Sequence, residues 1–84
     1  MNPNPTILSL YQPATYRIQV AGRLPELWRQ QFGEMEISVE HLENGAILTV
    51  LIAPVADQAG LHGLLSQFRD LGLPLISLEL MPAL

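Results

Sequence analysis

His62 is the residue with the clearest potential for chemistry, because an imidazole can transfer protons near physiological pH. Gln58, His62, Ser66 and Arg69 are spaced four, four and three residues apart, which places them along one flank of a helix. His62 and Arg69 together could form a proton-transfer site or an anion-binding site. The alternative is a solvated helix flank. We favour it because the spacing brings no nucleophile and no partnered carboxylate onto this row.

The other polar residues give weaker indications of a catalytic or metal site. Glu36, Ser38 and Glu40 alternate as they would on a solvent-facing strand, which explains them without a paired acid and base. His41 is expected at the helix-facing rim of a hairpin, and two histidines in different elements without cysteine make a poor metal site. The glycines form no phosphate-binding loop or dinucleotide motif. We therefore expect no enzyme activity, no metal and no cofactor.

Gly60 and Gly63 are unusual because they lie inside a predicted helix, where each glycine costs roughly 0.5–1 kcal/mol relative to alanine. With Ala59 they leave one side of the helix nearly smooth. Close approach of another helix, a neighbouring chain or the N-terminal tail would explain them. Sequence drift that the helix tolerates would explain them equally well.

The composition excludes several classes of protein. The 84 residues are 49% hydrophobic and 14% charged, which is far from the composition of a disordered chain. The formal charge is −4 and the four basic residues are dispersed arginines, so binding to nucleic acid or to an anionic membrane is disfavoured. No apolar run reaches the length of a bilayer span. The start of the chain lacks a signal-peptide pattern, so we expect a cytoplasmic protein.

The sequence divides into a tail and one small domain. Residues 1–14 contain three prolines and form the tail, in which residues 6–11 are apolar enough to add a strand or to contact a neighbouring chain. The domain spans residues 15–82. A domain of this size with so few charges leaves apolar surface uncovered, which predicts self-association or a larger protein partner.

The domain is predicted to contain six elements in the order strand, helix, strand, strand, helix, strand. Residues 15–21 alternate as a half-buried strand, and residues 24–32 repeat apolar side chains at helical spacing. Asp57 caps the second helix, Gly72 ends it, and residues 75–81 form the last strand. This order predicts a ferredoxin-like α+β sandwich, βαββαβ, with a four-stranded antiparallel sheet and both helices on one face.

The two middle strands are predicted to form a hairpin around Asn44-Gly45, the preferred pair for a two-residue type I′ turn. Val39 then lies opposite Val50, so that apolar residues face one another across the two strands. This register also fixes which side chains of the second hairpin strand face the helices.

The other face of the sheet, which we call the open face, is left uncovered by this arrangement. It is predicted to carry Arg17, Gln19, Glu36, Ser38, Glu40, Ile47, Thr49, Leu51, Leu75, Ser77 and Glu79. Its expected centre is formed by Leu51, Thr49 and Arg17. An apolar centre with a polar rim is typical of a protein interface, and a shallow pocket for a small molecule is the alternative.

Two functions fit these patterns. The first is a small non-enzymatic protein–protein interaction module, either a homodimer or an accessory subunit of a larger assembly. The second is a regulatory domain that binds a small anionic molecule on the open face through Arg17, or through Arg69. The candidate interaction residues are Arg17, Thr49, Leu51, Leu75, His62, Gly63 and Arg69.

The sequence also resembles a family of small uncharacterised bacterial proteins, through the run DQAGLHGLLSQFRDLGLPLISLE with YRIQVAGRL, Trp28 and Phe32 upstream. Members share a D-Q-A-x-L-H-G-L-L segment followed by R-D-L-G-x-P-L. The resemblance covers residues 16–79 and leaves the tail outside. Leu24 departs from the family pattern, which has a better helix cap after the glycine. No activity is assigned to the family, so the resemblance implies no catalytic residue.

Overall fold

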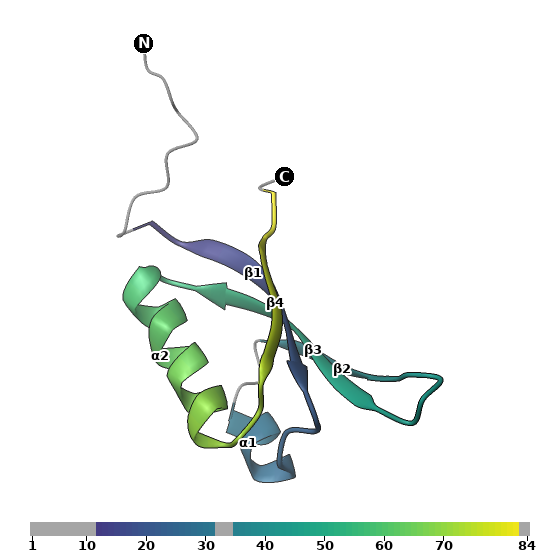
Figure 1. Ribbon diagram of the computed structural model, residues 1–84. Coiled ribbons are helices and arrows are strands. Elements are labelled where there is room, and N and C mark those ends of the chain that lie inside the picture. Colours follow the sequence, from purple (N-terminus) through teal and green to yellow (C-terminus); the bar gives the residue numbers. More distant parts are fainter. Residues whose placement is uncertain (1–11, 32–34, 83–84) are drawn as a thin grey trace.

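A computed structural model describes residues 12–31 and 35–82. Its elements are β1 (Ala14–Ala21), α1 (Glu26–Gln31), β2 (Glu36–His41), β3 (Ile47–Val55), α2 (Gln58–Asp70) and β4 (Leu75–Leu80) (Figure 1). The strands form one antiparallel sheet in the order β2-β3-β1-β4. The predicted βαββαβ order and α+β fold class are therefore confirmed. The predicted strand over residues 6–11 lies outside the described residues, as does Phe32.

Helix α2 begins and ends at the residues that the sequence indicates. The Asp57 carboxylate accepts a hydrogen bond from the N–H of Gly60 at 2.7 Å, which caps the first turn. At the other end the N–H of Leu73 donates to the carbonyl of Phe68 at 3.0 Å, and Gly72 has a φ of +76°. This is a Schellman ending, which requires a left-handed residue and so favours glycine. Both predicted ends of α2 are confirmed.

The core lies between the sheet and α2. It consists of Tyr16, Ile18, Val20, Leu24, Leu51, Ala53, Leu61, Leu64 and Phe68. Trp28 of α1 packs against this core, with its ring centroid 5.3 Å from that of Phe68. The core therefore joins both helices to the same side of the sheet.

Helix α1 begins later than the sequence pattern predicts. The carbonyl of Pro25 accepts hydrogen bonds from the N–H groups of Trp28 and Arg29, so the helix starts after the proline. Leu24 precedes the helix, and its spacing to Leu27 is not helical. Consequently Leu24 is buried while Leu27 is 76% exposed, and the predicted apolar stripe is wrong at Leu27.

The hairpin of β2 and β3 has a different turn from the predicted one. The N–H of Leu42 donates to the carbonyl of Ala46 at 2.8 Å, and the N–H of Gly45 donates to the carbonyl of Leu42 at 2.9 Å. The loop therefore contains three residues, Glu43, Asn44 and Gly45. Among the described residues positive φ occurs only at glycines, and Gly45 has a φ of +88°. A three-residue loop with a left-handed glycine is a common hairpin connection, and the predicted two-residue type I′ turn is wrong.

The side chain of Asn44 gives a physical reason for this turn. Its Oδ1 accepts a hydrogen bond from the N–H of Ala46 at 2.9 Å, which stabilises a turn with negative φ at Asn44. The extra loop residue shifts β3 by one position against β2, and a shift of one reverses the faces of a strand. Thr49 and Leu51 therefore face the helices, where both are fully buried, and Leu51 lies opposite Ile18.

Candidate interaction surfaces

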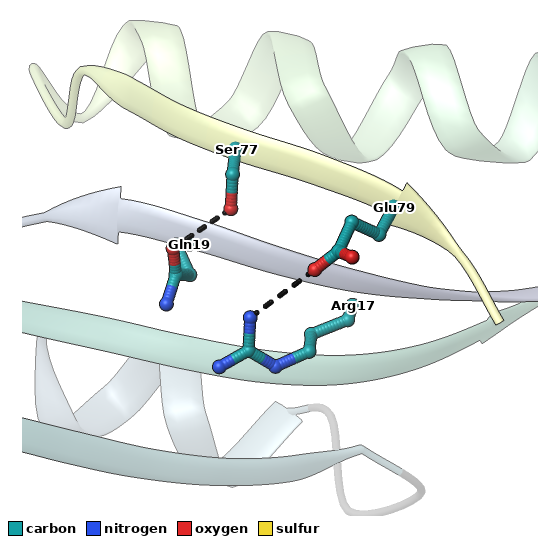
Figure 2. Close-up of polar contacts among 4 residues, drawn as sticks. All are labelled: Arg17, Gln19, Ser77 and Glu79. Atoms are coloured by element: carbon teal, nitrogen blue, oxygen red, sulfur yellow. Dashed lines mark hydrogen bonds and ion pairs between the residues drawn. The ribbon is translucent and has the colours of Figure 1, made fainter.

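The side chains of β1 and β4 on the open face form two polar pairs. Figure 2 shows Arg17, Gln19, Ser77 and Glu79 in front of the sheet, with both helices behind it. Arg17 Nη1 lies 3.3 Å from Glu79 Oε1, and the Ser77 hydroxyl donates to Gln19 Oε1 at 2.8 Å. Arg17 is therefore on the open face as predicted, where it forms an ion pair with Glu79.

The centre of the open face is apolar, although its residues differ from those predicted. Leu48, Val50 and Ile52 of β3 occupy it, because the observed register turns these positions away from the helices. Val50 is buried by its neighbours, and the other two are half-buried. An apolar centre with a polar rim thus exists, but the prediction named the wrong side chains of this strand, namely Ile47, Thr49 and Leu51.

Thr49 and Leu51 belong to the interior of the domain. The Thr49 hydroxyl donates to the carbonyl of Gly22 at 2.6 Å, which satisfies a polar group that is otherwise costly to bury. Leu51 is part of the core. Neither residue can contribute to a surface of the folded protomer, so their predicted placement on the open face is wrong.

The polar residues predicted to share one flank of α2 do not all face solvent. Gln58 faces inward, whereas His62 and Arg69 lie on an exposed flank. Gln58 Nε2 donates to the Tyr16 hydroxyl at 2.7 Å, so this side chain helps to close the core. His62 and Arg69 are exposed, and Arg69 Nε lies 3.3 Å from Asp70 Oδ1. In residues 12–31 and 35–82, no group of three or more His, Cys, Asp or Glu side chains could hold a metal ion. This geometry fits a solvated flank.

The two glycines of α2 have different surroundings. A methyl group at Gly60 would lie 3.3 Å from Asp57 Oδ1, the atom that caps the helix. A methyl group at Gly63 would meet no described atom within 4 Å. Close packing against the helix cap therefore explains Gly60. At Gly63 the described structure contains no neighbour that requires a glycine.

We expect Gly63→Ala to raise the free energy of unfolding by about 0.5–1 kcal/mol, because alanine has the higher helix propensity and meets no obstruction. Urea denaturation followed by circular dichroism measures the change. Gly60→Ala is the matched control and should gain less, since its methyl group approaches Asp57. A loss of stability in Gly63→Ala would contradict the open surroundings of this residue.

Edge strand β4 carries a row of exposed apolar side chains, which we call the β4 strip. Its members are Leu75, Ile76, Leu78 and Leu80, with exposed fractions of 50%, 53%, 39% and 44%. Leu75 was predicted on the open face, but the register change in β4 places it opposite Val20 on the helix side, so its predicted face is wrong. The other three were expected to lie under the helices. Leu78 and Leu80 do face the helix side, opposite Ile18 and Tyr16. They remain exposed because a helix about 10 Å wide covers only about two strands spaced roughly 4.8 Å apart.

A groove adjoins the β4 strip at the end of α2. It has a volume of about 450 Å³, and its walls include Leu65, Phe68, Leu73 and Leu75. Arg69 lines the same groove, so the fold brings together two of the predicted interaction residues, Arg69 and Leu75. The strip and the groove thus form adjoining apolar surface.

The outer edge of β4 also presents backbone hydrogen-bonding groups. The N–H of Met81 donates to the carbonyl of Thr15 at 2.8 Å. Hydrogen bonding alternates along an antiparallel strand, so the residues between those facing β1 direct their N–H and C=O groups outward. These outward residues are Leu78 and Leu80, because the pairing of β4 with β1 changes register between Ser77 and Leu75 and so interrupts the alternation at Ile76. An edge of this kind is a template for pairing with another strand.

The two edges of the sheet differ in charge. On β2 the residues Glu36, Glu40 and His41 are all exposed, and charged side chains along an edge oppose strand pairing. On β4 the one charged residue is Glu79, and it is paired with Arg17. Strand β4 therefore lacks the protection that β2 has.

A family model matches nearly the same residues as those that form the fold. Residues 15–79 match the family model described as Domain of unknown function (DUF8691). The chain belongs to the DUF8691 family. This confirms the predicted membership of an uncharacterised family, while the shared motif and the bacterial origin stay predictions. Neither the curated proteins nor the solved structures contain a significant match.

The DUF8691 domain thus has two candidate interaction surfaces, the open face and the β4 strip. The open face is lined by polar pairs around a half-buried centre. The β4 strip exposes large apolar side chains and backbone groups together. In the described part of the chain, no helix has the length and apolar character needed to cross a membrane.

Proposed function

We propose that this DUF8691 protein is a small, non-enzymatic, cytoplasmic protein–protein interaction module that associates with itself. One observation carries the proposal: four large apolar side chains, each at least 39% exposed, lie on a single edge strand. Contiguous exposed apolar surface marks interaction sites. Its burial is favourable by about 25 cal/mol per Å² of apolar area.

The composition supports the same proposal. With 14% charged residues in 84, few charges are present to solvate the surface of a lone protomer. A small domain gains stability when part of its core is shared with a partner. Self-association would cover the β4 strip and so provide this additional burial.

The alternative function, binding of a small anionic molecule through Arg17, has weaker support. Arg17 is already paired with Glu79 at 3.3 Å, so a ligand would have to displace that carboxylate. The apolar centre beside it offers no second charge to an anion. Self-association is therefore the function that the geometry favours.

Light scattering coupled to size-exclusion chromatography tests the proposal. At micromolar concentration we expect a mass above that of the 9.3 kDa chain, with little change in 1 M salt. Burial of apolar side chains persists in salt, whereas association through exposed charges is screened. A monomer at every concentration would contradict self-association.

A further inference from the structure

We propose that two copies of this protein pair through β4 in antiparallel orientation, about a twofold axis at Leu78, so that their sheets join into one. This inference rests on the proposed function, since it names the partner and the surface of the same association. The β4 strip, the outward backbone groups and the distribution of charge along the strand all contribute to it.

The backbone of β4 suits antiparallel pairing about this axis. Leu78 directs its N–H and C=O groups outward, so two copies of Leu78 can exchange hydrogen bonds across the axis. Leu80 of one copy, which also directs its backbone groups outward, then lies opposite Ile76 of the other, at the register change of β4. The outward groups of Leu78 in each copy are thus satisfied by Leu78 of the second copy.

The charge on β4 selects this register over a neighbouring one. An axis at Leu78 places Glu79 opposite Ser77 of the second copy. An axis at Glu79 would place two carboxylates directly opposite one another, which is destabilising. Glu79 is also neutralised by Arg17 at 3.3 Å, and Ser77 donates to Gln19 at 2.8 Å. The polar side of the joint is therefore compatible with a second copy.

The helix side of the joint is apolar. Leu78 and Leu80 face the side on which α2 lies, and α2 leaves them 39% and 44% exposed. In the pair, Leu78 of each copy lies beside Leu78 of the other, between the two flanking α2 helices. Association thereby buries the side chains that the fold of one protomer leaves in water.

Paired charge substitutions at Leu78 test the pairing. Leu78→Lys and Leu78→Glu each place two like charges across the axis, and we expect each to weaken self-association by about 100-fold or more. An equimolar mixture should recover dimers, because Lys then faces Glu. Native mass spectrometry resolves the heterodimer from either homodimer. Leu27→Lys and Leu27→Glu, on the exposed side of α1, are the matched controls and should remain dimeric.

Amide hydrogen exchange tests the same pairing in the unchanged protein. The outward N–H groups of Leu78 and Leu80 should exchange more slowly as protein concentration rises. The N–H of Glu79 faces β1 and should be protected at all concentrations, which makes it an internal control. Concentration-independent exchange at Leu78 in a dimeric protein would overturn the proposal, whether or not the Leu78 variants fold.

The remaining outcomes separate this inference from the proposed function. A dimer that persists in both Leu78 variants would overturn β4 pairing and leave self-association intact. A monomeric wild-type protein would overturn both. Two monomeric variants whose mixture stays monomeric would overturn the axis at Leu78. The variant Leu8→Pro should remain dimeric. If it became monomeric, the strand that pairs with the β4 edge would be residues 6–11 and not β4 of the second copy.

Discussion

Replacement of Leu51 by alanine is expected to lower the free energy of unfolding by about 2–5 kcal/mol, as for other buried leucines. Leu51 is fully buried in the centre of the sheet, opposite Ile18 on one side and Ile37 on the other. The shorter side chain leaves a cavity that the neighbouring strands cannot close. Urea denaturation should be measured at one protein concentration, because self-association makes stability depend on concentration.

Ile52→Ala is the matched control for this prediction. Ile52 follows Leu51 in β3 but lies half-buried on the open face, so its truncation should cost clearly less. The register expected from a two-residue turn would instead bury Ile52 and expose Leu51, so Ile52→Ala would then be the more destabilising change. A larger loss in Ile52→Ala than in Leu51→Ala would therefore contradict the three-residue loop.

Phe68→Ala is expected to lower the free energy of unfolding by about 3–5 kcal/mol. Phe68 is buried where α2, the sheet and α1 meet, and its ring lies 5.3 Å from that of Trp28 at an angle of 47°. Trp28 is the single tryptophan of the chain. Loss of the neighbouring ring should also shift its emission to longer wavelength, since water gains access to the indole.

Leu71→Ala, at the end of the same helix, is the control for Phe68→Ala. Leu71 is among the exposed apolar residues, so its truncation should change stability by less than about 1 kcal/mol. If Phe68→Ala and Leu71→Ala lowered the free energy of unfolding equally, Phe68 would not be the main stabilising contact of α2. An unchanged emission of Trp28 in Phe68→Ala would contradict the ring contact itself.

The features that the sequence predicted well depend on local signals. Asp57 and Gly72 act within one turn of the helix they bound, so both ends of α2 could be assigned before the fold was known. The order of strands and helices then restricts the topology to few arrangements. Arg17 was placed on the correct face because the alternation within β1 is unambiguous.

The hairpin register could not be predicted, for two physical reasons. Asn44-Gly45 is compatible with both a two-residue and a three-residue loop, and the bond from Asn44 to Ala46 favours the longer one. Residues 47–52 read ILTVLI, with apolar side chains on both faces. A shift by one residue therefore leaves an apolar row on either face, and the pattern does not select between them.

The β4 strip could not be located from the sequence because exposure there depends on where α2 lies across the sheet. The run LISLEL is apolar on one face and partly so on the other. Such a run indicates burial but does not say whether a helix or a second chain provides it. Leu75 could be named as an exposed residue, but its face could not, because the register change in β4 turns it to the helix side. The exposure of Ile76, Leu78 and Leu80 required the tertiary arrangement.

The contrast between the two sheet edges has a consequence for the size of the assembly. A sheet whose two edges both accept strands can add copies without end and grows into a fibre. Here Glu36 and Glu40 place charge along β2, so a pair joined at β4 presents only charged outer edges among its described strands. In the proposed pair, growth would then stop at two chains. The carboxylates of β2 would thus keep the association finite.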